Sequence, residues 1–132
     1  MELYISPEEL KALMRCRPNV RYQYALKRIA DTESLWSITD SNGSFVVHTF
    51  ENRQLFSIWS SKEYAEAFCI NDNAKYKCCA ISLDYFEDCV IDFICENGLL
   101  INVFPTEKEP LGKIVSLNKF AEDLSAFLED YE

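Results

Sequence analysis

The hydrophobic positions follow a helical spacing at the start of the chain. The segment Ser6-Pro7-Glu8-Glu9 combines a capping serine, a proline at the first helical position and a glutamate at the third, which predicts a helix start. After Pro18, apolar residues three and four apart predict a second helix. We expect its buried face to contain Tyr22, Leu26 and Ile29, and its outer surface to be basic, with Arg21, Lys27 and Arg28.

From Leu35 the apolar spacing changes to two, and aromatic and β-branched residues become frequent. The segments 35–39 and 44–50 flank Asp40-Ser41-Asn42-Gly43, whose Asn-Gly pair favours a tight hairpin turn. A third extended segment, 53–59, follows a short polar turn. We therefore expect three sequential antiparallel strands.

In the second half, helical and extended patterns alternate. Ser60-Ser61-Lys62-Glu63 resembles a capping box that begins a helix ending near Phe68, and Asp84 is expected to cap a helix that ends near Glu96. Further strands are expected at 76–83, 99–104 and 113–116, and a last helix begins near Asn118. The predicted core face of the helix 84–96 comprises Tyr85, Phe86, Cys89, Val90, Phe93 and Ile94.

These elements predict one α+β domain over residues 1–132, with a largely antiparallel sheet flanked by about five helices. The chain has 132 residues and 48% hydrophobic composition, which is sufficient for one core. The first ten residues carry three glutamates and no basic segment before an apolar run, so we expect no signal peptide and a cytoplasmic location. No apolar stretch is long enough to cross a bilayer, and no membrane partner is expected.

The net charge of −9 lies in the last third of the chain. Residues 1–83 contain ten acidic and ten basic side chains, whereas residues 84–132 contain twelve acidic side chains against three lysines. This excess disfavours a nucleic-acid partner, because it would repel phosphates, although Arg15, Arg17, Arg21, Lys27 and Arg28 form a modest basic patch. A basic protein is the partner that such a charge distribution favours.

Acidic residues recur on two predicted helices, where like charges four residues apart are mutually destabilising. Either this surface is merely solvated, or it receives a basic partner. The candidate partner-binding residues are Asp84, Glu87, Asp88, Asp92, Glu96, Glu122, Asp123, Glu129 and Asp130.

The sequence shows no convincing catalytic constellation, and we expect no enzyme activity and no cofactor. His48 is the only histidine and lies in a predicted strand, which favours a solvent-facing or hydrogen-bonded structural role. We expect structural, buried thiols at all six cysteines, with a redox pair such as Cys89 and Cys95 as the alternative. The spacing of Cys and His favours no metal site.

The segment Leu55 to Ala65 resembles a family of small uncharacterised bacterial proteins that carry a Leu-Pro-Leu-Trp-Pro type segment between a strand and a helix. The chain departs from that family at Ser57 and Ser60, where the family tends to have proline, and in its number of cysteines. Further matching positions occur in order along the chain, at Arg21-Tyr22, Tyr24, Trp36, Asp84, Phe86, Val103-Phe104-Pro105 and Gly112. The resemblance implies an α+β fold, a bacterial cytosolic origin and no known catalytic residues.

In size and acidity the chain also resembles immunity proteins, which bind and block bacterial toxins delivered by secretion or contact. The leading hypothesis is therefore an immunity protein that neutralises a toxin, such as a basic nuclease, through its acidic surface. The alternatives are a small cysteine-dependent enzyme or redox protein, and a general protein-interaction module.

Overall fold

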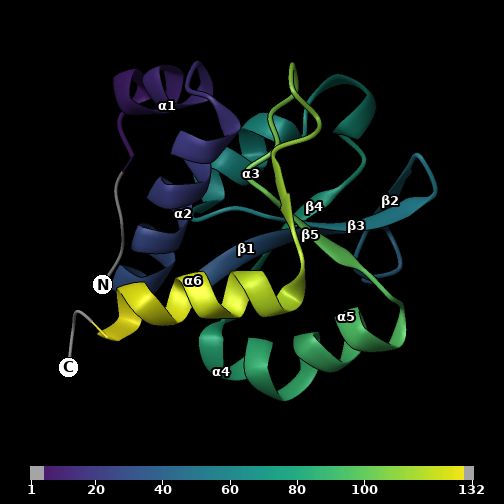
Figure 1. Cartoon of the computed structure of the whole chain (residues 1–132). Coiled ribbons are helices and arrows are strands. Elements are labelled where there is room, and N and C mark those ends of the chain that lie inside the picture. The colour runs from purple at the N-terminus through teal and green to yellow at the C-terminus, as the bar shows by residue number, and fades with distance from the viewer. Residues whose placement is uncertain (1–4, 130–132) are drawn as a thin grey trace.

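The computed structural model describes residues 5–129 and shows an α+β fold in which strands and helices share one hydrophobic cluster (Figure 1). Its strands are β1 (Ser34–Thr39), β2 (Val47–Phe50), β3 (Arg53–Ile58), β4 (Lys77–Ser82), β5 (Leu100–Val103) and β6 (Lys113–Val115). Its helices are α1 (Pro7–Met14), α2 (Pro18–Thr32), α3 (Lys62–Phe68), α4 (Leu83–Tyr85), α5 (Ile91–Glu96) and α6 (Leu117–Glu129). A π-helical segment, η2 (Phe86–Val90), joins α4 to α5, and a short 3-10 turn, η1 (Asn71–Asn73), follows α3.

The strands form two sheets. β1 pairs antiparallel with β4, and a four-stranded sheet has the order β2-β3-β5-β6. Within the second sheet β2–β3 and β5–β6 are antiparallel, while β3–β5 is parallel. Since α4, η2 and α5 run as one continuous helical segment, the described chain has five helices besides η1. The predicted α+β class and largely antiparallel pairing are confirmed.

The expected meander of three sequential strands is wrong. The tight turn expected at residues 40–43 is present, since the Asp40 amide donates to the Ser44 carbonyl at 2.9 Å. Of the three segments, however, only β2 and β3 pair as a continuous ladder, whereas β1 pairs along its whole length with β4, from Ser34 opposite Ser82 to Thr39 opposite Lys77. β1 meets the segments that follow it through isolated bridges, from Thr39 to Phe45 and from Trp36 to Trp59, and through the Ser37 hydroxyl, which donates to the Ser57 carbonyl at 2.7 Å. Local alternation defines a strand and its two faces but carries no information about its partner, which the whole fold selects.

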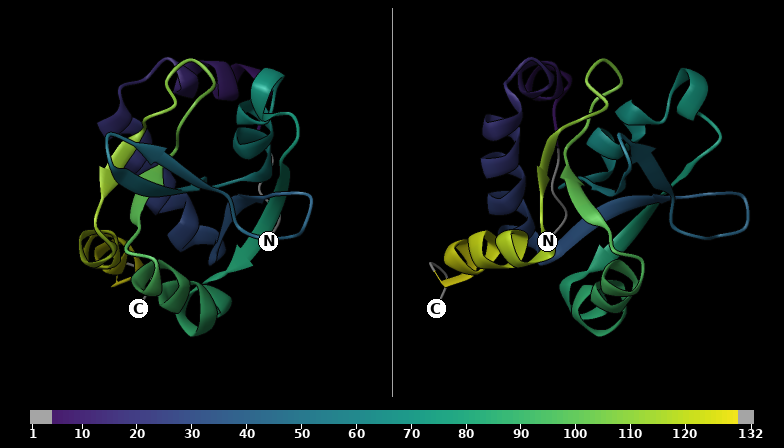
Figure 2. Two further views of the ribbon diagram at one scale, coloured as in Figure 1. Left: turned by 90° about the vertical axis from the view of Figure 1, so that its right-hand side faces the viewer. Right: turned by 45° about the vertical axis from the view of Figure 1, so that its right-hand side comes forward.

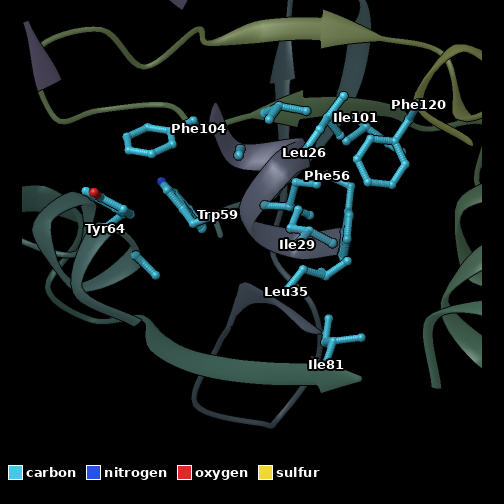
Figure 3. Packing of buried hydrophobic residues seen from close by; sticks show 14 of the residues in the cluster. Leu26, Ile29, Leu35, Phe56, Trp59, Tyr64, Ile81, Ile101, Phe104 and Phe120 are labelled. Atoms are coloured by element: carbon cyan, nitrogen blue, oxygen red, sulfur yellow. The ribbon is translucent and has the colours of Figure 1, made fainter. Parts of the chain in front are cut away.

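The helices lie on both sides of the four-stranded sheet (Figure 2). Because successive side chains alternate, Phe56 and its register partner Ile101 face one side, whereas Leu55, Ser57 and Asn102 face the other. The first side packs against α2 and α6, where Figure 3 shows Leu26, Phe56, Ile101 and Phe120 together. The second side is covered by less secondary structure, and this difference positions the cleft described below.

A second aromatic group lies beside the α3 end of the core. Figure 3 shows Trp59, Tyr64 and Phe104 set apart from the residues around Leu26. The Tyr64 and Phe104 ring centroids are 4.6 Å apart, and Trp59 is fully buried. The Trp59 indole N–H donates to the carbonyl of Pro105 at 2.9 Å, which satisfies its buried polar atom. These rings tie the start of the connection between β5 and β6 to α3.

The helical segment 83–96 begins and packs differently from the prediction. Ser82, not Asp84, is the cap, since its Oγ accepts from the Tyr85 amide at 3.1 Å. The segment buries Phe86, Val90 and Ile94, whereas Tyr85 and Cys89, both expected in the core, are exposed. The buried residues are spaced four apart, so the buried face is narrower than expected and its centre lies away from Tyr85 and Cys89.

Two predicted helix caps have different outcomes. Ser6 caps α1, accepting from the Glu9 amide at 3.1 Å, so this helix start is confirmed. At α3 the N-cap residue is Ser61, which makes no side-chain capping bond, and the expected capping box from Ser60 to Glu63 does not form. The Ser60 and Ser61 hydroxyl oxygens are buried with no hydrogen-bond partner among the described residues. Burial of both serines at the helix entry replaces the local capping geometry that the sequence favoured.

Candidate functional site

The helical segment 83–96 presents the first candidate binding surface. We call its five carboxylate residues the acidic face; they are Asp84, Glu87, Asp88, Asp92 and Glu96. All five are exposed, and within the part of the chain that the structure describes none of them takes part in an ion pair. No lysine or arginine occurs between residues 78 and 107, so the segment supplies no countercharge of its own. The face therefore carries a concentrated and uncompensated negative charge.

The second acidic helix, α6, lies beside this segment (Figure 1). The rings of Phe86 and Phe120 pack edge to face, with centroids 5.7 Å apart, and so fix the two helices against each other. Glu122 and Glu129 are exposed on α6. Asp130 lies outside the described residues.

Asp123 on α6 is an internal hydrogen-bonding partner as well as a surface residue. Its carboxylate accepts from the Tyr22 hydroxyl at 2.6 Å and pairs with Lys119 at 3.2 Å. The hydrogen bond from Tyr22, together with Lys119, lowers the pKa of Asp123, while burial and the same bond raise the pKa of Tyr22. Asp123 thus links α6 to α2, and less of its charge is available to a partner than the sequence suggested.

Arg21 is not on a basic outer surface, as predicted, but is fully buried. Its Nε donates to the Phe104 carbonyl at 3.1 Å, and its Nη1 donates to the Cys16 carbonyl and pairs with Glu109 at 3.0 Å. The guanidinium also lies over the Phe104 ring, 5.9 Å from its centroid. Arg21 therefore fastens α2 to the connection between β5 and β6. Its partners are backbone carbonyls 5 and 83 residues away in sequence, which no local pattern reveals.

The remaining basic patch is correspondingly smaller. Arg15, Arg17 and Lys27 are exposed, but Arg28 pairs with Asp31 at 3.3 Å and lies over the Tyr24 ring, 5.4 Å from its centroid. With one arginine buried and another paired, few free cations remain on this side to contact phosphates.

A cleft of about 630 Å³ lies against the second side of the four-stranded sheet. Its floor is formed by strand residues, and its walls come from the segment around η1 and from the connection between β5 and β6. Phe50 and Ile70, two of the large hydrophobic residues that the fold leaves exposed, both line it. This cleft was not predicted, because its residues come from separate segments whose proximity depends on the parallel pairing of β3 with β5. The one local signal of the cleft was Phe50, a large hydrophobic residue in a predicted strand, which the fold leaves exposed.

His48 lies in this cleft and is not simply solvent-facing. It is half-buried, with its ring centroid 6.2 Å from that of Phe68 and 5.8 Å from that of Tyr76. Burial, and secondarily the charge of Lys75, lowers the pKa of His48, so the imidazole is neutral at pH 7. Its side chain has no hydrogen-bond partner within residues 5–129 to orient it as a catalytic base.

One wall of the cleft is held in place by close backbone contacts. Asn102 is buried; its amide donates to the Pro110 carbonyl at 2.9 Å, and its Oδ1 accepts from the Gly112 amide at 2.7 Å. A Cβ atom at Gly112 would lie 2.2 Å from the Val103 carbonyl oxygen, so only glycine fits at this position. The connection between β5 and β6 is therefore a defined structure rather than a loose charged turn.

The cysteines are less buried than predicted. Cys89 and Cys95 are exposed and the other four are half-buried, so the interpretation of six buried structural thiols is wrong. The structure brings Cys69 and Cys78 together at a smaller pocket of about 340 Å³. Burial raises the pKa of both thiols, that of Cys78 to about 12, and the neighbouring Cys69 raises the pKa of Cys78 further. These thiols are protonated at neutral pH, the opposite of what a nucleophilic or redox-active cysteine requires.

Two structural findings concern the remaining classes of site. Within residues 5–129, no three His, Cys, Asp or Glu side chains converge in a way that could hold a metal ion. In the same residues, no helix has the length and apolar character needed to traverse a bilayer.

Several of the positions that carry the family resemblance lie around the connection between β5 and β6, whereas Trp36 lies in β1, Asp84 in α4 and Phe86 in η2. Arg21 and Trp59 bond to the carbonyls of Phe104 and Pro105, and Gly112 bonds to Asn102. These residues shape the fold, which accounts for their specific types without any catalytic role.

No curated protein matches the chain. A family model described as "Protein of unknown function (DUF2750)" matches residues 22–124, which contain both the acidic face and the cleft. The chain belongs to the DUF2750 family.

Proposed function

We propose that this protein is a non-enzymatic binding protein of the immunity type, which captures a basic toxin, such as a nuclease, in the cytoplasm through its acidic face. The observation that carries the proposal is that Asp84, Glu87, Asp88, Asp92 and Glu96 are all exposed, and none is ion-paired within the described residues. Like charges spaced four residues apart lower helix stability by a few tenths of a kcal/mol per pair. Binding of a basic partner to this surface would explain why the helix carries charges that lower its stability.

The charge distribution favours protein capture over phosphate binding. Complementary fields accelerate association toward about 10⁸ M⁻¹s⁻¹ at low salt and disfavour wrong partners. Nucleases hold anionic substrates in basic active sites, so an acidic surface can occupy the same region and exclude the substrate. The raised pKa of Cys69 and of Cys78 gives the alternative of a cysteine-dependent enzyme less support.

The test begins with the gene next to the one that encodes this chain. If it encodes a large secreted protein with a basic C-terminal domain, that domain is expressed alone and together with this protein, and bacterial growth is measured. We expect growth arrest by the domain and rescue on co-expression. Growth arrest without rescue, or a neighbouring domain that does not bind the purified protein, contradicts the proposal.

Charge reversal then tests the surface. The variant D88K/D92K/E96K is compared with the matched control E8K/E51K/E66K, which changes the net charge equally at exposed positions away from the acidic face. We expect the first variant to lower the association rate about tenfold or more at low salt and to reduce its salt dependence, with normal folding. Equal effects of the two variants would show that only net charge matters, and no effect of either would exclude the acidic face as the binding surface.

A further inference from the structure

The cleft on the second side of the sheet has the dimensions and walls of a small-molecule site. Its volume of about 630 Å³ lies within the range of roughly 300 to 1,000 Å³ that is typical of ligand pockets. Accessible apolar surface comes from Phe50 on the hairpin, from Ile70 after α3 and from Leu111, while the buried Leu55 and Phe68 lie beneath it. This volume is far larger than a single amino-acid side chain needs.

The polar groups of the cleft are acidic or neutral. Asp72, Glu107 and Glu109 line it, and none of its lining residues is a lysine or an arginine. Glu109 is already paired with the buried Arg21, and one oxygen of Glu107 accepts from the Asn71 amide at 3.0 Å. The second oxygen of Glu107 and the carboxylate of Asp72 make no hydrogen bond or ion pair within residues 5–129.

A cation from the chain itself already lies near one end of the cleft. The Lys75 ammonium lies over the ring of Tyr76, 5.3 Å from its centroid, and Tyr76 in turn packs against His48.

We propose that this cleft binds a small aromatic amine, with its ring against Phe50, Ile70 and Leu111 and its ammonium group facing Asp72 and Glu107. The apolar walls bury the ring, and the two carboxylates select the charge of the head group. Because these carboxylates are partly exposed, charge contributes selectivity more than affinity. This inference is independent of the proposed capture of a basic protein, which uses the acidic face on the helical segment 83–96.

His48 supplies a direct readout, since it is the only histidine in the chain and lines the cleft. Its ring signals and its titration are followed by NMR with three probes of similar size: 2-phenylethylamine, 2-phenylethanol and 3-phenylpropionate. The charged groups around His48 are Lys75, Asp72, Glu107 and Glu109. Bound ammonium adds a positive charge near the imidazole, so we expect the first probe to lower the pKa of His48 further.

We expect the amine to bind in the millimolar range, about three- to fivefold more tightly than the alcohol, and the anion to bind least, which matches the contribution of a partly exposed ion pair. Equal binding of the three probes, or strongest binding of the anion, would overturn the proposal. So would the absence of any change in the His48 signals at saturating probe. The compound Nα-acetyl-lysine amide mimics a lysine side chain of a protein, with its ammonium group free. If it binds more tightly than 2-phenylethylamine, the assignment to a free aromatic amine is overturned in favour of a protein side chain.

Two variants test the carboxylates and one controls for net charge. D72N and E107Q should each remove most of the preference for the amine over the alcohol, while binding of the alcohol is unchanged. E87Q, on the acidic face, changes the net charge equally and should leave both affinities unchanged. If the preference persists in the D72N/E107Q double variant, these carboxylates do not select the ligand and the proposal fails. None of these results depends on whether the acidic face binds a toxin.

Discussion

Replacement of Arg21 by methionine tests the role of the buried guanidinium most directly. Methionine keeps much of the side-chain length and removes the charged donors, so the Phe104 and Cys16 carbonyls lose their hydrogen bonds. The Phe104 residue is 1% exposed, and its carbonyl therefore loses its side-chain donor where water has little access. An unsatisfied buried acceptor costs about 1 to 3 kcal/mol, and a hydrogen bond from a charged donor contributes about 1.5 to 3 kcal/mol.

Other contributions are smaller and partly opposed. Glu109 is half exposed, with 50% of its side-chain surface accessible, so after the replacement its carboxylate returns to water at little cost. The Nη2 atom of Arg21 is buried with no hydrogen-bond partner in residues 5–129, and its removal relieves a desolvation penalty. The net expectation is that R21M lowers the free energy of unfolding by about 2 to 4 kcal/mol. E109A should lower it by less than about 1 kcal/mol, because the ion pair is half exposed.

Urea denaturation followed by tryptophan fluorescence measures both variants, with K27M as a control at an exposed position of the same helix. The midpoint of R21M should fall at an unchanged slope, and K27M should stay within about 0.5 kcal/mol of the parent protein. Hydrogen exchange at the Thr106 and Gly112 amides should accelerate in R21M, because these groups belong to the connection that Arg21 holds. If R21M changes the free energy of unfolding by less than about 0.5 kcal/mol, the reasoning is refuted.

The remaining predictions concern packing, titration and thiol reactivity. In the same denaturation assay, G112A should lower the free energy of unfolding by about 3 kcal/mol or more, because its Cβ would overlap a carbonyl oxygen. G98A, with open space around the new Cβ, should lower it by only about 1 kcal/mol. Equal losses in the two variants would contradict this reasoning. The pKa of Asp123 is lower in the folded protein than its ordinary value of 3.8, so its contribution to stability is present above that pH and is lost as the pH falls through the folded value. D123N should therefore flatten the acid limb of stability against pH, and parallel curves would contradict this. Iodoacetamide at pH 7.5, followed by mass spectrometry, should label the exposed Cys89 about 100-fold faster than Cys78, whose pKa is about 12, and equal rates would contradict this.

Local signals in the sequence were sufficient for most elements. Ser6-Pro7 marks the start of α1, Asn97-Gly98 follows the end of α5, and the strands expected at 99–104 and 113–116 contain β5 and β6. Within one predicted helix, the segment 83–96, the buried face differs from the prediction. In the helical segment 83–96 the core covers only the narrow face of Phe86, Val90 and Ile94, and the width of a buried face depends on what packs against it, which a hydrophobic period does not specify.

The division of charge was also available from the sequence, and the exposure of Asp88 and Asp92 on the helical segment agrees with it. What the charges alone did not reveal is which carboxylates are already used inside the protein. Asp123 accepts from Tyr22, which is 101 residues away in sequence, and Glu109 pairs with Arg21, which is 88 residues away. The acidic face is therefore narrower than a count of acidic residues indicates.

The sequence by itself determined which segments are helical or extended and where the negative charge accumulates, because periodicity, capping and composition are properties of neighbouring residues. The tertiary structure alone decided that β1 pairs with β4, that Arg21 is buried, and that His48 and Glu107 share a cleft. Each of these depends on contacts between segments distant in sequence, and their free energies are settled by the packing of the whole chain around one core.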